Sequence, residues 1–189
     1  MDLLDSFARA AREAQAEVVV ATTYDDARRR VTEILRAEDA RFVMVSPDAA
    51  TQPWSCGDDL PTAGLRVVTR SAAHNDREEL LATDAGVTVA AYGLADTGTL
   101  VLCASPGDHR LDSLLPPVHV ALVRASTLLP DLATAFARFS ADDRFARHSA
   151  VTFVRGPSRT ADIEMTLTIG VHGPGKLYIV LLDDSTFSS

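Results

Sequence analysis

Residues 18–47 read VVVATTYDDARRRVTEILRAEDARFVMVSP, and this stretch decides the fold class. Its apolar start predicts a short strand over 18–21. Thr23 has the hydroxyl side chain that is typical of a helix N-cap, so the Arg- and Glu-rich segment 24–37 is predicted to be helical. The apolar run that follows, closed by Pro47, predicts a buried strand over 41–46. Strands that alternate with helices are typical of an α/β fold.

The same alternation continues along the chain. It predicts a Rossmann-like α/β fold, an open and mostly parallel sheet with helices on both faces, in which the strands around 93–96 could pair antiparallel. A length of 189 residues suits a single domain, 1–189, on which N-terminal helices over about 1–38 pack as an extension. Further helices are predicted over 1–16, 75–85 (ending at Gly86), 108–115 and 127–139, a loop over 51–64, and strands over 65–69, 87–92, 97–104, 118–123, 151–154 and 177–182.

The composition excludes several classes of function. With 18 basic and 26 acidic residues the net charge is −8, which argues against binding to nucleic acid or to an anionic membrane surface. The N-terminus lacks the apolar core of a signal peptide and no apolar run reaches the length of a membrane span, so a cytoplasmic location is expected. The two cysteines, Cys56 and Cys103, have no CxxC spacing, so they are expected to form neither an iron–sulfur cluster nor a zinc site.

Three polar loops are candidates for a binding site, because ligands of open α/β sheets bind at the carboxyl ends of strands. The first is Asp96-Thr97-Gly98-Thr99, which precedes an apolar strand. Its residue types also suit a plain tight turn, and both interpretations stay open.

The second loop runs from Gly156 to Glu164 and reads GPSRTADIE. If the chain is helical from Ile163 onward, Ser158, Thr160 or Asp162 lies near a helix N-terminus, where backbone N–H groups favour an anion. Arg159 would add a bidentate donor for a carboxylate or phosphate. The alternative is a capping box with no ligand.

The third loop precedes the last strand and contains His172 and Gly173 between further glycines and prolines. His172 is either a general base, a ligand contact or a turn histidine bonded to backbone. None of the five histidines forms an HxxxH or HExxH motif, so no metal is expected. A GxGxxG fingerprint and a P-loop are also absent, so no cofactor is predicted.

Four segments in a fixed order carry a resemblance to a known family. They are DTGT over 96–99, LLPPVHVA over 114–121, GPSRTADIE over 156–164, and a stretch over 167–174 that ends in GVHGP. With these segments the chain resembles the lactate-utilisation protein C family, the LutC-type LUD-domain proteins, over about 65–183.

The resemblance implies both a fold and a pathway. The fold is expected to be similar to that of the sugar-isomerase and CoA-transferase (NagB/RpiA/CoA-transferase-like) superfamily. The pathway is the oxidation of L-lactate to pyruvate by a three-component system, in which iron–sulfur partner proteins carry the cysteine clusters. A chain with two separated cysteines agrees with the non-redox subunit of such a system.

Two hypotheses of function follow. The chain is either an accessory subunit of a lactate-oxidising iron–sulfur complex that binds a small anion or a partner protein, or a stand-alone isomerase- or transferase-type enzyme that acts on a carboxylated or phosphorylated small molecule. In the second case Arg159 would hold the anion, and Asp162, Glu164 or His172 would act as acid or base. Under either hypothesis, Asp96 to Thr99, Ser158 to Asp162 and His172 to Gly173 are expected to lie together at one edge of the sheet.

Overall fold

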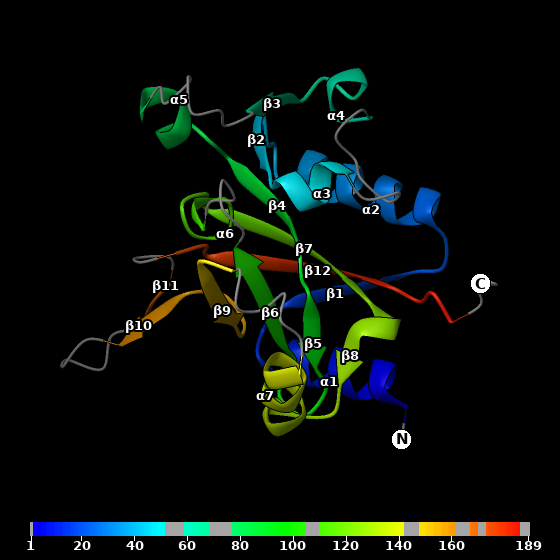
Figure 1. Ribbon diagram of the computed structural model, residues 1–189. Coiled ribbons are helices and arrows are strands. Elements are labelled where there is room, and N and C mark those ends of the chain that lie inside the picture. Colours follow the sequence, from blue (N-terminus) through cyan, green and yellow to red (C-terminus); the bar gives the residue numbers. More distant parts are fainter. Residues whose placement is uncertain are drawn as a thin grey trace.

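The computed structural model in Figure 1 describes residues 2–51, 59–68, 77–104, 110–141, 148–161, 167–169 and 173–185. These residues form a six-stranded sheet, a four-stranded sheet and a separate two-stranded hairpin, with helices around them. The predicted α/β class, with a parallel sheet flanked by helices, is confirmed.

The six-stranded sheet is parallel throughout, with the strand order β1-β12-β7-β4-β2-β3. Lys176 pairs with Val118, so β12 and β7 begin side by side. Segments that precede these two strands therefore meet at the amino end of the sheet. The strands are β1 (Glu17–Ala21), β2 (Phe42–Val45), β3 (Arg66–Val68), β4 (Ala85–Val89), β7 (Val118–Arg124) and β12 (Lys176–Leu182).

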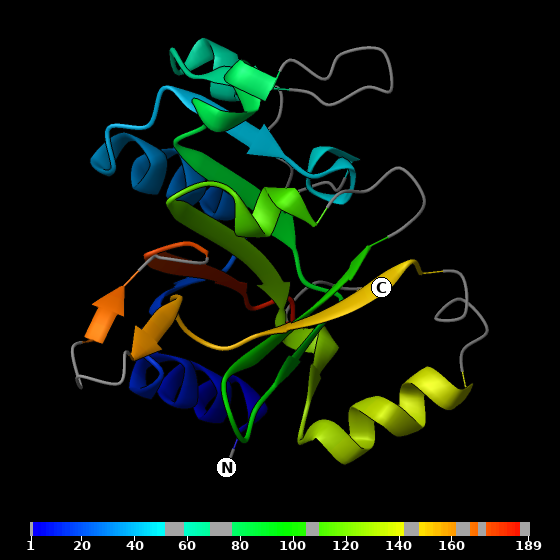
Figure 2. The same ribbon diagram turned by 90° about the vertical axis from the view of Figure 1, so that its left-hand side faces the viewer.

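Alternate side chains of the central strands enter two different cores. Val120 and Val180 pack into the core under helix α2 (Tyr24–Ala37), whose first turn is capped by the Thr23 hydroxyl, as predicted. Leu177 and Ile179 pack into the core on the other face, together with helix α1 (Leu3–Glu13) and part of the smaller sheet. Figures 1 and 2 show α2 on one side of the large sheet and α1 on the other.

The smaller sheet has the strand order β8-β5-β6-β9. Its members are β5 (Tyr92–Leu94), β6 (Thr99–Ala104), β8 (Leu128–Leu129) and β9 (Ala150–Val154). The predicted antiparallel pairing around 93–96 is the β5–β6 pair. Helix α7 (Leu132–Ala141) packs on β5 and β8, while β10 (Arg159–Ala161) and β11 (Leu167–Ile169) form the hairpin that projects from the body in Figure 1.

The remaining helices are short. They are α3 (Pro47–Thr51), α4 (Asp59–Thr62), α5 (Arg77–Leu81), α6 (Leu111–Leu114) and the 3₁₀ turn η1 (Ala125–Thr127). Within the parts of the chain that are described, no helix combines the length and apolarity needed to cross a membrane.

Several predicted boundaries are wrong: the predicted loop 51–64 contains α4, the predicted strand 87–92 is divided between β4 and β5, and two further errors arise from contacts between elements. Gly86 does not end a helix but lies inside β4, where the backbone carbonyl oxygen of Asp112 is 1.8 Å from the position that a Cβ would take. Glycine thus allows α6 to lie directly on β4. The helix predicted from residue 127 begins at Leu132, because the segment before it pairs with β5 and the Asp131 carboxylate accepts a bond from the Thr134 backbone N–H at 2.7 Å.

Candidate functional site

A cleft of about 600 Å³ opens at the amino ends of β7 and β12. His119 and Leu177, each the second residue of its strand, lie in its lining. Its walls come from α6, from β9 and the segment 155–158 that follows it, from the end of α1, and from Gly173 and Pro174. In Figure 1, β7 and β12 begin near α6 and β9 on the left-hand side.

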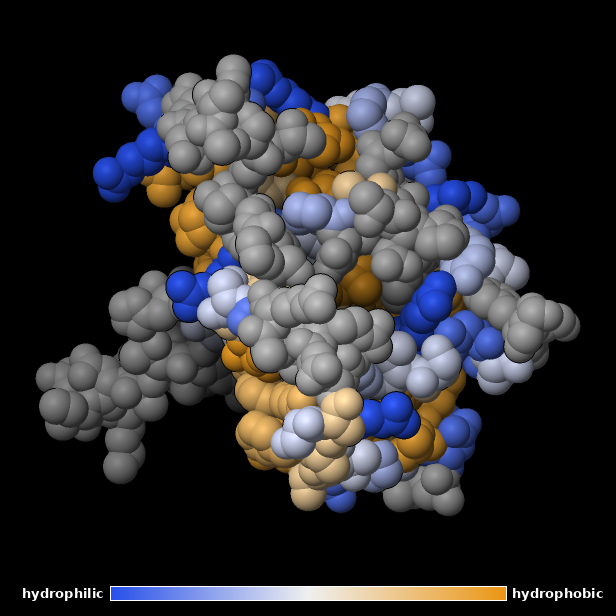
Figure 3. All heavy atoms as spheres, in the orientation of Figure 1, coloured by the Kyte–Doolittle hydropathy of each residue, from blue (hydrophilic) through white to orange (hydrophobic). Residues whose placement is uncertain are grey.

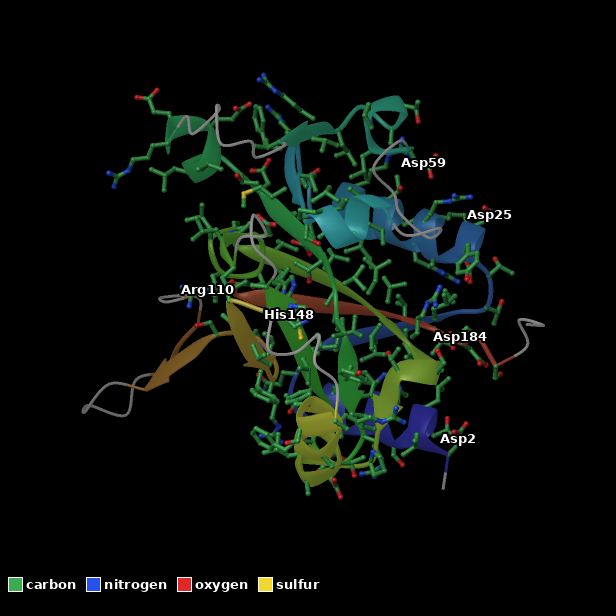
Figure 4. All side chains as sticks on the ribbon, viewed as in Figure 1. Asp2, Asp25, Asp59, Arg110, His148 and Asp184 are labelled. Carbon is green, nitrogen blue, oxygen red and sulfur yellow. The ribbon has the colours of Figure 1, made fainter. Side chains whose placement is uncertain are left out.

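At the opposite end of the sheet, side chains at or just after the ends of β7 and β12 form hydrogen bonds with neighbouring segments. Asp184, which follows β12, accepts a bond from the Ser126 backbone N–H at 2.9 Å, and Arg124 donates to the Tyr24 hydroxyl at 3.0 Å. Figure 4 places Asp184 far across the molecule from Arg110, which precedes α6. The cleft thus lies at the amino ends of the parallel strands, although the rule for open α/β sheets directs attention to their carboxyl ends.

The segment 155–158 joins three parts of the chain beside the cleft. Gly156 has φ +67°, and a Cβ there would lie 2.1 Å from the Ala14 carbonyl oxygen, so only glycine lets the segment lie against the end of α1. Arg155 donates from Nε to the Thr97 carbonyl oxygen at 3.1 Å. The Ser158 backbone N–H donates to the Pro174 carbonyl oxygen at 2.8 Å.

Ser158 and Gly173 are the predicted site residues that line the cleft. They are adjacent, since a Cβ on Gly173 would lie 3.3 Å from the Ser158 Cβ. Arg159 and Thr160 lie on β10, where only the backbone is described, while Asp162, Glu164 and His172 lie outside the described residues.

The turn Asp96-Thr97-Gly98-Thr99 connects β5 and β6 and is not part of the cleft lining. Its hydroxyls bond within the turn, with Thr97 Oγ1 2.9 Å from Thr99 Oγ1. Gly98, at φ +66°, packs against the backbone of Ala11 on α1. The turn reaches the cleft only through the bond between Thr97 and Arg155.

The described part of the segment after Ser158 is a β-hairpin and not the start of a helix. Arg159 pairs with Ile169 and Thr160 with Thr168 in an antiparallel register. The β-branched residues at these positions favour strands. Ile163, where the predicted helix would begin, lies outside the described residues, so the role of Ser158 and Thr160 as anion ligands at a helix N-terminus stays a prediction.

His119 is the polar residue of the cleft that sequence analysis did not propose as a site. Its side chain is buried, with Nε2 2.8 Å from the Thr88 hydroxyl on β4. Burial lowers the pKa of His119 to about 4, so the ring is neutral at pH 7. A histidine inside the apolar run 118–123 was the one signal in the sequence that could have identified it.

The cleft combines hydroxyls, one basic group and apolar walls. Ser113, Thr152 and Ser158 bring hydroxyls, and the exposed Arg155 brings a positive charge. The negative charge of Glu13 at the rim is paired with Arg9 at 3.1 Å. Such a site can hold an organic molecule through hydrogen bonds, apolar contacts and one ionic contact.

In the described ranges, no three His, Cys, Asp or Glu side chains gather as a metal site would require. Cys103 is a half-buried residue of β6, and Cys56 lies outside those ranges.

Comparison with known proteins assigns the family. The LUD domain family model matches residues 4–182, which include α1 apart from its first residue and every strand of the large sheet. The chain belongs to the LUD domain family. The crystal structure of a DUF162 family protein from Deinococcus radiodurans has the same fold, with a TM-score of 0.72 at 24% identity over 95% of this chain and 96% of that one.

Several LUD relatives are named lactate utilization protein C, which confirms the resemblance read from the sequence. The protein from Bacillus licheniformis is 38% identical over 162 residues, or 79% of this chain and 68% of the relative. The one from Halalkalibacterium halodurans is 31% identical over 165 residues, or 86% and 72%. The match to the Exiguobacterium protein is 41% identical over 110 residues, but it spans only 48% of that relative.

Proposed function

We propose that this LUD-domain chain is a non-redox accessory subunit of a system that oxidises L-lactate, works beside iron–sulfur partner proteins, and binds an anionic ligand in its cleft. The similarity to lactate utilization protein C over 79–86% of the chain is the observation that carries this proposal. With two cysteines the chain alone does not supply the four thiolates that a cluster usually needs, so electron transfer falls to the partners.

The ligand half of the proposal is supported by Arg155. Its Nε is engaged by the Thr97 carbonyl oxygen, which orients the guanidinium at the cleft. The terminal nitrogens of an arginine held in this way form a fork that matches a carboxylate or phosphate. The Ser158 hydroxyl lies in the same wall and is a further donor to an anion.

Complementation tests the proposal. A bacterial strain that lacks its own lactate utilization protein C, and so fails to grow on L-lactate, is expected to regain growth when it expresses this chain. Arg155→Ala is expected to weaken ligand binding about tenfold, the lower end for a charge-assisted pair because Arg155 is exposed, and so to slow growth on L-lactate. Growth rates on L-lactate and on glucose are compared.

Arg29→Ala is the matched control for this experiment. Arg29 is an exposed arginine of α2, on the other face of the sheet, where it pairs with Asp26 and Glu33. Its removal is expected to leave growth on L-lactate unchanged. Failure of the unmodified chain to restore growth would refute the accessory role, and equal growth of the two arginine variants would refute the role of Arg155.

A stand-alone isomerase or transferase is the second candidate, and His119 is the observation that favours it. A neutral imidazole beside a hydroxyl can accept a proton from a substrate in the cleft. Its pKa of about 4 is far below the range in which a general base is most effective at pH 7, so we rank this function second. Turnover of a carboxylated or phosphorylated small molecule by the isolated chain, lost in His119→Gln, would reverse the ranking.

A further inference from the structure

We infer that the cleft binds an extended, amphipathic anion several times larger than lactate, and not lactate or pyruvate themselves. This inference rests on the ligand site of the proposed function and specifies its chemical class. Lactate occupies roughly 100 Å³, a few times the volume of one water molecule. The cleft measures about 600 Å³, within the range of sites that enclose larger organic ligands.

The lining shows what such a ligand must offer. Leu114, Val154 and Leu177 present apolar surface from three different elements, α6, β9 and β12. Leu114 is 42% exposed, so this side chain leaves apolar surface for a ligand to cover. A short hydroxy acid has too little apolar surface to cover walls on three sides. A ligand with a flat or aliphatic body has enough.

The polar groups lie at separate places around that apolar surface. Arg155 brings a positive charge in the segment after β9, and His119 lies buried near the start of β7. Because burial keeps the imidazole neutral, it can exchange a hydrogen bond with a ligand but adds no charge. A ligand matches both side chains when it carries an acidic group at Arg155, an uncharged polar atom near His119 and an apolar body between the two.

A second, smaller cavity lies next to the cleft. This cavity of about 30 Å³, enough for one water-sized group, is lined by Thr88 and Ser46 and shares Ser113 and Thr152 with the cleft. Thr88 is also the hydrogen-bond partner of His119. One ordered water, or one small polar group, fits this cavity.

Anilinonaphthalene sulfonate, a fluorescent anion with an aromatic body, is a direct probe of this class. It is expected to bind the native chain, and millimolar L-lactate or pyruvate is expected not to displace it. Arg155→Ala is expected to weaken its binding about tenfold, through loss of the ionic contact. Leu114→Trp, which fills the cleft from α6, is expected to weaken it by a similar or larger factor.

A surface outside the cleft provides the control. Apolar side chains gather over α7 (Figure 3), where Leu132 is 43% exposed and is not part of the cleft lining. Leu132→Ser is expected to leave binding of the probe within twofold of the unmodified chain.

Three outcomes would overturn the inference. They are loss of probe binding in Leu132→Ser alone, displacement of the probe by L-lactate or pyruvate, and absence of probe binding at neutral pH. Displacement by L-lactate would still leave the proposed accessory role standing, because the cleft would then be a site for the short acid. If the chain fails to restore growth but binds the probe as expected, the accessory role is refuted and the inferred ligand class still stands.

Discussion

Replacing Gly86 by alanine is expected to lower the free energy of unfolding by about 3 kcal/mol or more, at the upper end of overpacking effects. The new Cβ would lie 1.8 Å from the carbonyl oxygen of Asp112 and 2.9 Å from its carbonyl carbon. Both are backbone atoms of α6, which cannot rotate aside as a flexible side chain can. Helix α6 must then move off β4 and carry Ser113 and Leu114 out of the cleft wall.

Thermal unfolding followed by circular dichroism measures this effect. For a chain of this size 1 kcal/mol corresponds to about 2–4 °C in Tm, so a fall of roughly 6–12 °C is expected. Gly64→Ala is the control, because Gly64 has φ +82° but no atom within 4 Å of a new Cβ. Its cost is limited to backbone strain of about 1–2 kcal/mol. A Gly86→Ala variant with the same Tm as the unmodified chain would show that α6 does not pack directly on β4.

Acid is expected to destabilise the fold through His119. Burial lowers the pKa of His119 in the folded chain from about 6.5 to about 4, so the unfolded chain binds a proton first as the pH falls. Stability linked to the neutral ring is complete above about pH 6.5 and is lost progressively down to about pH 4. At about 1.4 kcal/mol for each pH unit, the loss amounts to roughly 3 kcal/mol.

Urea unfolding between pH 7 and pH 4 tests this effect, with His119→Gln as the comparison. Glutamine keeps a polar group near Thr88 and takes up no proton in this range, so the variant retains only the acid sensitivity of the carboxylates. As the pH falls from 7 to 4, the free energy of unfolding is expected to decrease by about 3 kcal/mol more in the unmodified chain than in His119→Gln. Parallel curves across the whole range would show that His119 is not held neutral by burial.

Much of the fold was predictable because its elements have strong local signals. The buried strands are short apolar runs, as in β7, and the cap at Thr23 precedes an amphipathic helix. The errors arise where tertiary contacts override local patterns. Gly86 resembles a helix end in sequence, but its missing side chain serves the approach of α6. Leu128 and Leu129 resemble helix, but they pair with β5.

The site was harder to predict than the fold. The predicted site residues Ser158 and Gly173 line the cleft, and glycine and proline mark the segments that turn into it. His119 and Ser113 also line the cleft but were not predicted, because each reaches it only through contacts with elements distant in sequence: Thr88 lies 31 positions from His119. The position of the cleft at the amino ends of the strands follows from the placement of β9 and α6 beside β7 and β12, which no local pattern records.

Growth of a cleft-filling variant tests the central claim, that this cleft serves lactate utilisation, most directly. Leu114→Trp adds bulk inside the cleft, and Leu132→Trp makes the same change on α7, outside the cleft lining, at a residue of nearly equal exposure, 43% against 42%. Both variants are expected to melt like the unmodified chain. In the strain that lacks its own lactate utilization protein C, Leu132→Trp is predicted to support growth on L-lactate and Leu114→Trp to abolish it. Full growth with Leu114→Trp would contradict the account.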